Sequence, residues 1–237
     1  MRLLYIFPHP DDESFGPAGA MRRQTLDGHE VHLLTLTRGG ATQVRHELDL
    51  SIDAMGEVRL HELEAATAVL GLAGLHVTDL PDSGLKEMDP RAIEAVIRTE
   101  IEALQPAIVV SYPVHGISGF HDHLVCHAVV KRVFLEMKDQ GADYLKRLAF
   151  FTLAESAAEQ LPASKFNLKT SPPDLIDCVV DAGEAGQAAF FRALDCYATY
   201  RETIRRSNVR NIVTRKISFE IFQEAHEPPL TDLTDGI

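Results

Sequence analysis

Short apolar runs alternate with longer segments of helical periodicity along most of this chain. Runs rich in aliphatic and β-branched residues occupy 2–7, 31–37, 75–80 and 107–112. Segments with helical spacing separate them at 17–28, 57–72 and 91–105. A strand and helix series of this kind predicts a mostly parallel sheet with helices on both faces. We therefore expect a Rossmann-like α/β fold.

The rest of the chain continues the alternation less regularly. Further strands are expected at 148–155, 175–182 and 217–225, and further helices at 124–138 and 184–206. No internal repeat or shift of composition marks a second domain, and a chain of 237 residues with 45% hydrophobic content can bury one core of ordinary size. We predict a single domain over residues 1–237, with the C-terminal strands and helices added to the sheet.

Acidic side chains outnumber basic ones, with 35 Asp and Glu against 23 Lys and Arg, a net charge of -12. This excess argues against nucleic acid or an anionic membrane surface as a partner, because phosphate binding depends largely on cationic side chains. No stretch approaches the roughly 20 apolar residues that cross a bilayer, and the N-terminus lacks the apolar region of a signal peptide. We expect a cytoplasmic protein without membrane insertion that binds a small molecule.

Two stretches rich in His and Asp follow the first and the fourth expected strands. They are FPHPDDESFG at 7–16 and HGISGFHDH at 115–123. Ligands of open α/β sheets bind at the C-terminal ends of the parallel strands, so both stretches are expected at one edge of the sheet. One acid there could simply cap a helix or close a turn. Three adjacent acids repel one another, and together with these histidines they favour a divalent metal such as Zn²⁺, which takes imidazole and carboxylate ligands.

The chain also resembles a known family, the PIG-L/LmbE-like de-N-acetylases. HPDDE at 9–13 is the signature of that family, whose members use zinc to remove the acetyl group from N-acetylglucosamine-type amides. Further similar stretches follow in the family's order: LTRGGAT at 36–42, VRLHELEAATAVLGL at 58–72, LPDSGL at 80–85 and GFHDH at 119–123. The resemblance covers roughly residues 1 to 135. It implies an amidohydrolase acting on an N-acetylated amino sugar or its conjugate.

The resemblance also implies roles for individual residues. His9, Asp12 and His123 would be metal ligands, and Asp11 would be the general base. The metal would be Zn²⁺ or another divalent ion such as Fe²⁺. A bound zinc can lower the pKa of its water ligand to about 7, which supplies the nucleophile that amide hydrolysis needs. Family members often form homo-oligomers, so a homo-oligomer is also implied.

Candidate substrate contacts come from three other places. Arg59 and Asp82 fall where the family contacts substrate, and His115 lies in the second His-rich stretch. For Arg59 a different role is open, an ion pair with Glu62 on a solvated helix face. His46 lies in the long connection 39–56, which could cover the site as a lid.

GFHDH departs from the family's usual Gly-His-Pro-Asp-His. Phe120 stands where the family has the histidine that stabilises the transition state, and His121 stands where it has proline. Either His121 takes over that role, oriented by Asp122 or helped by His115, or the electrophile is missing. The second explanation keeps open a metal-binding or regulatory protein with weak or no turnover.

Two more alternatives concern the ligand set and the reaction. His123 and His127 are spaced i, i+4 and could chelate a metal from one helix face. Tyr197 and Tyr200 stand where the family has a histidine and a glutamine, which leaves the rim of the pocket uncertain. Dinucleotide, P-loop and GxSxG nucleophile motifs are absent from the sequence, so those enzyme classes are not supported.

Overall fold

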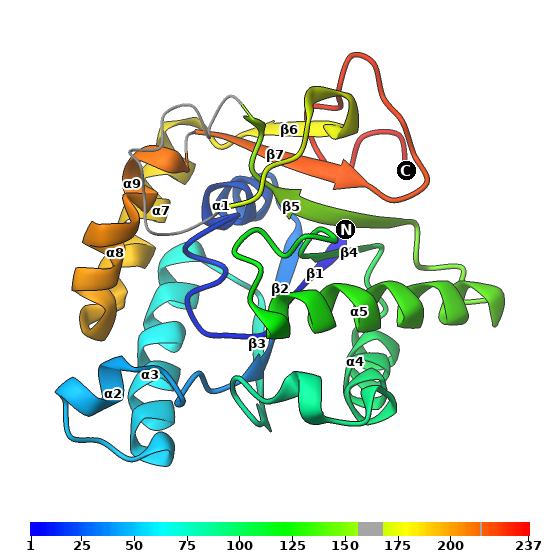
Figure 1. The fold of residues 1–237 in the computed structure, drawn as a ribbon. Helices are drawn as coiled ribbons and strands as arrows, with labels where there is room; N and C mark the ends of the chain where they lie inside the picture. Colours follow the sequence, from blue (N-terminus) through cyan, green and yellow to red (C-terminus); the bar gives the residue numbers. More distant parts are fainter. Residues whose placement is uncertain (156–167, 214) are drawn as a thin grey trace.

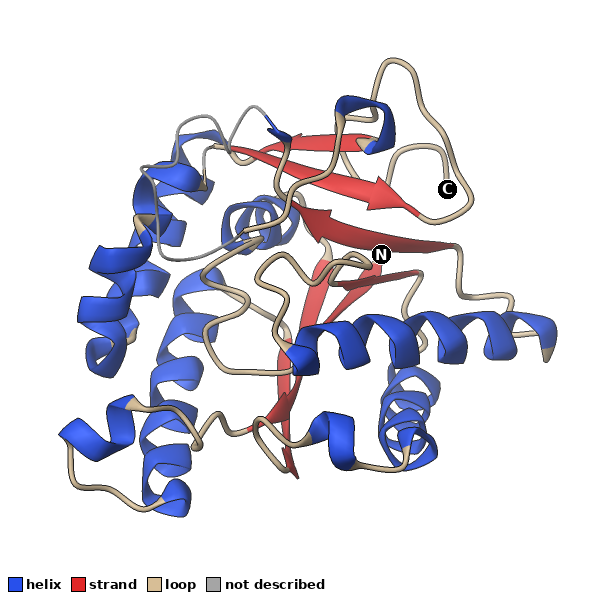
Figure 2. Ribbon diagram, in the orientation of Figure 1, coloured by secondary structure: helices blue, strands red, loops and turns tan. Residues whose placement is uncertain are grey.

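The computed structural model describes residues 1–155, 168–213 and 215–237, and these residues form one seven-stranded sheet with helices against both faces (Figures 1 and 2). The strands are β1 (Arg2–Phe7), β2 (Glu30–Thr37), β3 (Gly74–Leu80), β4 (Ile108–Ser111), β5 (Arg147–Thr152), β6 (Cys178–Asp181) and β7 (Lys216–Ile221). Their order is β3-β2-β1-β4-β5-β7-β6. The run from β3 to β5 is parallel, and β7 pairs antiparallel with both β5 and β6. The predicted α/β fold with added C-terminal strands is confirmed.

The helices divide between the two faces of the sheet. They are α1 (Ala18–Leu26), α2 (Val44–Glu47), α3 (Ile52–Leu70), α4 (Pro90–Leu104), α5 (His121–Asp139), α7 (Gly183–Cys196), α8 (Arg201–Ser207) and α9 (Val209–Ile212). Helices α1, α3 and α7 pack together on one side, and α4 packs on α5 on the other (Figure 1). Among the residues the structure describes, no helix is both long and apolar enough to cross a membrane.

Strand β1 shows why this sequence needs two helical layers. All of its residues from Leu3 to Phe7 are fully buried. Leu3, Tyr5 and Phe7 belong to one hydrophobic cluster, whereas Leu4 and Ile6 belong to the other. Successive side chains of a strand point to opposite faces, so a run without polar alternation requires a covered sheet on each side. The expectation that all of residues 1–237 form a single domain stays a prediction.

Several elements begin or end away from their predicted positions. Helix α3 starts at Ile52 rather than Glu57, because Ser51 accepts a hydrogen bond from the Ala54 N–H and caps the helix. With α2 and the start of α3 inside residues 39–56, that stretch is not the long irregular connection we expected. Helix α5 starts at His121, three residues before its predicted start.

The predicted helix 184–206 is interrupted. Helix α7 ends at Cys196, a short 3-10 helix (Ala198–Tyr200) follows, and α8 begins at Arg201. At the break Tyr197 leaves helical geometry, with φ −84° and ψ 70°, and its side chain is 1% exposed. A buried tyrosine hydroxyl needs a hydrogen-bond partner. Its partners lie in the loop after β1, so the break is tied to the candidate site.

Candidate functional site

The candidate site lies at the C-terminal ends of the central parallel strands. His9 and the three acids follow β1, and His123 belongs to the first turn of α5, which follows β4. Strands β1 and β4 are hydrogen-bonded neighbours, so their following loops start side by side. The sheet topology therefore brings together the two His-rich stretches, as the sequence predicted.

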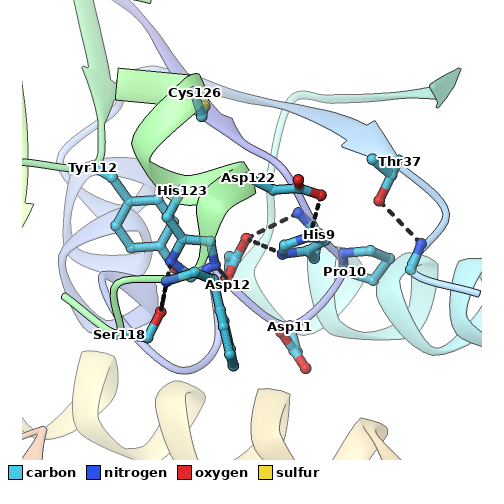
Figure 3. A network of polar contacts seen from close by, with 12 residues as sticks. His9, Pro10, Asp11, Asp12, Thr37, Tyr112, Ser118, Asp122, His123 and Cys126 are labelled. Atoms are coloured by element: carbon cyan, nitrogen blue, oxygen red, sulfur yellow. Dashed lines mark hydrogen bonds and ion pairs between the residues drawn. The ribbon is translucent and has the colours of Figure 1, made fainter. Parts of the chain in front are cut away.

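His9, Asp12 and His123 converge on one point (Figure 3). The His9 Nδ1 atom lies 3.5 Å from Asp12 Oδ2, and the His123 Nε2 atom lies 3.4 Å from Asp12 Oδ1. One ligand atom from each residue falls within 4.8 Å of the others. Two imidazoles and one carboxylate are a donor set that suits Zn²⁺ or Fe²⁺, and three protein ligands leave a position open for water or substrate. These residues could hold a divalent metal.

Tyr112 and the loop before α5 orient His123. The Tyr112 ring stacks on the His123 ring, with centroids 4.1 Å apart and planes 11° apart. Its hydroxyl donates a 2.7 Å hydrogen bond to Asp12 Oδ1. The His123 Nδ1 atom lies 2.9 Å from the Gly116 carbonyl oxygen and 3.1 Å from the Ser118 hydroxyl. A hydrogen bond from Nδ1 to that carbonyl leaves the Nε2 lone pair free for a metal ion.

A second pair of carboxylates faces the other nitrogen of His9. Its Nε2 atom lies 3.2 Å from Asp122 Oδ2 and 3.3 Å from Asp82 Oδ1. Burial lowers the pKa of His9, but hydrogen bonds to Asp12 and Asp122 and the charge of Asp82 outweigh burial and raise it to about 10. When both imidazoles are neutral, the carboxylates thus give this cluster a net negative charge. A divalent cation fits this excess, and its binding would displace a proton from His9.

Asp82 and Asp122 are themselves fixed by backbone donors. Asp82 accepts a hydrogen bond of 2.6 Å from the Ala41 N–H, and Asp122 accepts one of 2.8 Å from the Ser83 N–H. Asp122 is therefore directed toward His9 and the loop after β3. None of the hydrogen bonds given for Asp122 among the described residues reaches His121, so the orientation of His121 by Asp122 stays a prediction.

Asp11 forms an ion pair with a buried arginine. The Arg59 Nη2 atom lies 2.9 Å from Asp11 Oδ2 and also donates to the Pro10 carbonyl oxygen. The Arg59 side chain is 2% exposed, and its guanidinium carbon lies 4.0 Å from the centroid of the Tyr200 ring. The alternative pairing of Arg59 with Glu62 on a solvated helix face is thus wrong. Glu62 instead accepts hydrogen bonds from the Thr199 N–H and hydroxyl.

Burial and charge compete at Asp11. Burial raises the pKa of its carboxyl group, the positive charge of Arg59 lowers it, and the negative charge of Asp12 raises it, giving a pKa of about 6. A carboxylate with this pKa is ionised at pH 7 and can accept and return a proton. The backbone of Asp11 has φ 88°, a conformation that residues other than glycine rarely adopt.

Tyr197 and Glu13 hold this strained turn. The Asp11 N–H donates to the Tyr197 hydroxyl oxygen at 2.9 Å, and this hydroxyl donates to Glu13 Oε1 at 2.7 Å. Glu13 Oε1 also accepts a hydrogen bond of 2.6 Å from the Ser14 hydroxyl. The sequence associated Tyr197 only with the part of the chain that shapes the rim of the pocket and gave no prediction of this support. The one indication in the sequence was that a tyrosine stands where the family has a histidine.

Phe120 and His121 lie at the mouth of the site. Phe120 is 58% exposed. Its ring makes a T-shaped contact with the His123 ring, with planes at 89° and centroids 5.6 Å apart. His121 is the exposed first residue of α5, and its side chain lines the same cavity as His9 and Asp11. His121 can therefore reach a bound molecule from the position next to the absent family histidine.

The other two candidate histidines point elsewhere. The His115 Nε2 atom lies 3.3 Å from the Ser171 hydroxyl, and His115 is not among the described residues that line the cavity. Its side chain would have to turn to contact a substrate there. The His127 Nδ1 atom lies 2.9 Å from the Tyr112 carbonyl oxygen, and its ring packs on Phe150. The clusters of possible metal ligands found within the described ranges do not include His127.

The candidate metal ligands face a cavity of about 570 Å³. Its wall includes the three possible metal ligands, together with Asp11 and Arg59. This volume falls within the usual range for small-molecule sites. A cavity with a place for a metal, an adjacent proton acceptor and a fixed arginine can bind and hydrolyse an uncharged polar group such as an amide.

Comparison with known proteins gives a consistent picture. Residues 4–147 match the family model PIG-L, described as GlcNAc-PI de-N-acetylase. The chain is 32% identical over 183 residues to a 1D-myo-inositol 2-acetamido-2-deoxy-alpha-D-glucopyranoside deacetylase of Rhodococcus opacus, covering 66% of this chain and 63% of that protein. The protein of the same description from Actinosynnema mirum is 31% identical, with 68% of this chain and 70% of that protein covered. The chain thus spans a little under two thirds of the Rhodococcus protein's length.

Solved structures share the fold at lower identity. A teicoplanin deacetylase has a TM-score of 0.71 and 16% identity, covering 95% of this chain and all of that chain. A zinc-inhibited form of that deacetylase also matches, with a TM-score of 0.69, 15% identity and the same shares of both chains. A 4-carboxy-2-hydroxymuconate hydratase of Pseudomonas putida has a TM-score of 0.68 and 13% identity, with 95% and 98% of the two chains covered. Deacetylases and a hydratase therefore share this fold, so the reaction has to be argued from the site.

Proposed function

Because this chain belongs to the PIG-L family of de-N-acetylases, we propose that it is a metal-dependent deacetylase acting on an N-acetylated amino-sugar conjugate. The observation that carries the proposal is the convergence of His9, Asp12 and His123 beside the ion pair of Asp11 and Arg59. The relatives named above are deacetylases of an acetamido-glucopyranoside of inositol, which supports a substrate of this class.

His9, Asp12 and His123 would hold the metal. When bound, the metal would act as a Lewis acid that polarises the acyl oxygen and makes water more acidic. We infer Zn²⁺ as the ion, with Fe²⁺ as the alternative, because both accept two imidazoles and a carboxylate. The zinc-inhibited structure of a deacetylase with this fold makes the choice of ion an experimental question.

Asp11 would act as the general base. Its carboxylate would accept a proton from the attacking water and later return it to the departing amine. The ion pair with Arg59 fixes the carboxylate and keeps its pKa below the value that burial would give. In this scheme Arg59 positions Asp11, and Asp82 positions His9, so neither needs to contact the substrate directly.

His121 would supply the electrophile for the oxyanion. It lines the cavity one position after Phe120, which stands where the family has its transition-state histidine. A protonated or neutral imidazole can donate a hydrogen bond to the developing charge, whereas a phenyl ring cannot. Removal of one such donor typically lowers kcat by about 10²–10³-fold.

Phe120 also motivates a second candidate, a metal-binding protein of this family with weak or no turnover. The two candidates differ in what His121 contributes. Release of acetate from a panel of N-acetylglucosamine conjugates, measured for the wild type, Asp11→Asn and His121→Ala, separates them. We expect turnover that falls by at least about 100-fold in both variants while the bound metal is retained.

The control for this experiment is Phe120→His, which restores the family residue. An increase in turnover in Phe120→His, with no loss in His121→Ala, would show that His121 does not substitute for it. Full metal occupancy without turnover on any member of the panel would favour the metal-binding candidate. A possible homo-oligomer and the expected lack of nucleic-acid binding both stay predictions.

A further inference from the structure

The cavity that holds the candidate metal ligands has two unlike walls. One wall carries the imidazoles, the carboxylates and Arg59. The rest of the lining includes an apolar wall of hydrocarbon side chains: Phe15, Phe151, Leu153, Val209, Ile212 and Val213. A molecule that fills the cavity must therefore present a polar side to one wall and an apolar side to the other.

The apolar wall is enclosed rather than being a patch on the surface. Phe151, Val209 and Ile212 are 3%, 4% and 4% exposed, and Leu153 and Val213 are each 8% exposed. Apolar space shielded from water is poorly hydrated and binds hydrocarbon in preference to polar groups. A bare monosaccharide would leave this part of the cavity without a matching partner.

The charges around the cavity argue against an anionic ligand. Among the described residues that line it, Arg59 is the one lysine or arginine, and it is already paired with Asp11. The other charged lining residues are acids, including Asp12, Asp82 and Asp122. Away from the proposed metal position, a phosphate or a free carboxylate on the substrate would therefore meet no unpaired lysine or arginine among these lining residues.

The two walls come from different parts of the chain. The family model covers residues 4–147, which include the metal ligands, Asp11 and Arg59. Most of the apolar wall lies beyond this span, on the end of β5, on the residue that follows it and around α9, which lies beside α8 and α7 in Figure 1. The apolar wall is thus contributed by a part of the chain that the family match does not describe.

We propose that the substrate carries an uncharged hydrocarbon group larger than methyl, which binds against the apolar wall while the amide lies beside the polar lining residues. The inference rests on the proposed deacetylase function, because it places the amide beside Asp11. The hydrocarbon could be the acyl chain of the amide or the aglycone of the sugar. Both sources have the same chemistry, and a substrate series distinguishes them.

The experiment uses two matched series of glucosamine derivatives. In the first series the compounds are methyl glycosides whose N-acyl group is acetyl, butyryl or hexanoyl. In the second series the N-acetyl group is kept and the aglycone is methyl, butyl or hexyl. Burial of a methylene contributes about 0.8 kcal/mol, so we expect kcat/KM in one series to rise up to about fourfold per methylene. The series that rises identifies the source, and two flat series would overturn the inference. A terminal carboxylate on the longest chain should remove the gain.

Binding of the same compounds to Asp11→Asn, measured by calorimetry, requires no turnover. Affinity that rises with chain length, without hydrolysis by the wild type, would overturn the proposed function and support the apolar subsite. Hydrolysis of the acetyl compound by the wild type, with affinity independent of chain length, would overturn the inference and leave the proposed function intact. The two failures are therefore distinguishable.

Two variants localise the effect. Val213→Phe adds bulk to the apolar wall, and Leu168→Asn makes a half-buried lining residue polar. We expect both to reduce the gain from a longer chain by at least about tenfold. Leu175→Asn is the matched control, because Leu175 is 49% exposed and is not a described lining residue. If Val213→Phe lowers the melting temperature strongly, Leu168→Asn decides, and an unchanged chain-length preference there contradicts the subsite.

Discussion

The Tyr197 hydroxyl oxygen accepts a hydrogen bond from the backbone N–H of Asp11 across 186 positions of sequence. The Asp11 backbone has φ 88°, so the turn after β1 needs support from outside the loop. Tyr197 gives this support together with Glu13, whose carboxylate accepts from both the tyrosine hydroxyl and the Asp11 N–H. The C-terminal part of the chain thus fixes the candidate general base.

Tyr197→Phe keeps the ring in its buried position and removes the hydroxyl. We expect kcat to fall by about 10- to 100-fold with the metal content unchanged, because Asp11 loses a fixed position next to the reacting water. Loss of one buried hydrogen-bond partner should also lower the free energy of unfolding by about 1–3 kcal/mol. Tyr144→Phe serves as the control, since Tyr144 is only partly buried and is not among the described residues that line the cavity. Wild-type kcat in Tyr197→Phe would refute the positioning role.

Metal content distinguishes the two proposed ligand sets. We expect His9→Ala, Asp12→Ala and His123→Ala each to lose most of the bound metal, because each removes one of three converging donors. His127→Ala should retain it, since the Nδ1 of that ring faces the Tyr112 carbonyl. Elemental analysis after dialysis measures the result. Loss of metal in His127→Ala, but not in His9→Ala, would reverse the assignment.

Arg59→Met should be strongly destabilising. It leaves the half-buried Asp11 beside the buried Asp12 without its cation, and removal of one partner of a buried ion pair typically costs about 3–5 kcal/mol. Urea denaturation measures the change in the free energy of unfolding. The control is Arg38→Met, because Arg38 pairs with Glu57 and Asp79 on the surface, where an ion pair is worth about 0–1 kcal/mol. Equal effects of the two substitutions would contradict the structural role of Arg59.

Glu224 should make stability depend on pH at the acid end. Burial raises its pKa, but hydrogen bonds from Arg147 at 2.8 and 2.7 Å and from His226 outweigh burial and lower it. A folded-state pKa below the unfolded value of about 4.3 means that its contribution is complete above that pH. The contribution is lost as pH falls through the folded-state pKa. The difference in unfolding free energy between the wild type and Glu224→Gln should therefore be complete at pH 7 and shrink as pH falls below about 4.3.

The exposed residue Glu184 provides the control for this pH series. Glu184→Gln should follow the wild type across the whole range, because it removes an exposed carboxylate. A constant difference between the wild type and Glu224→Gln from pH 7 to pH 3 would contradict the assigned ion pair. Urea denaturation at each pH gives the values to compare.

The sequence was most informative where local pattern and topology act together. The apolar run of β1 predicted a buried parallel strand, and the rule for strand ends placed His9 and His123 at one edge of the sheet. The start of α3 was missed, although Ser51 has the side chain of a helix cap. The contact between Tyr197 and Asp11 could not be read from the pattern, since it depends on how the C-terminal helices pack. The same packing broke a helix that periodicity alone predicted as continuous.

The full burial of β1 determines how firmly the loop with His9 and Asp12 is anchored. Leu3 to Phe7 have no exposed surface, and β1 is hydrogen-bonded to β2 on one side and to β4 on the other. Amide protons in such a strand exchange with solvent only when the protein unfolds extensively. The loop with His9 and Asp12 therefore starts from the segment that should exchange most slowly, so local fluctuations leave its anchor in place. The positions of His9 and Asp12 should therefore persist for as long as the sheet does.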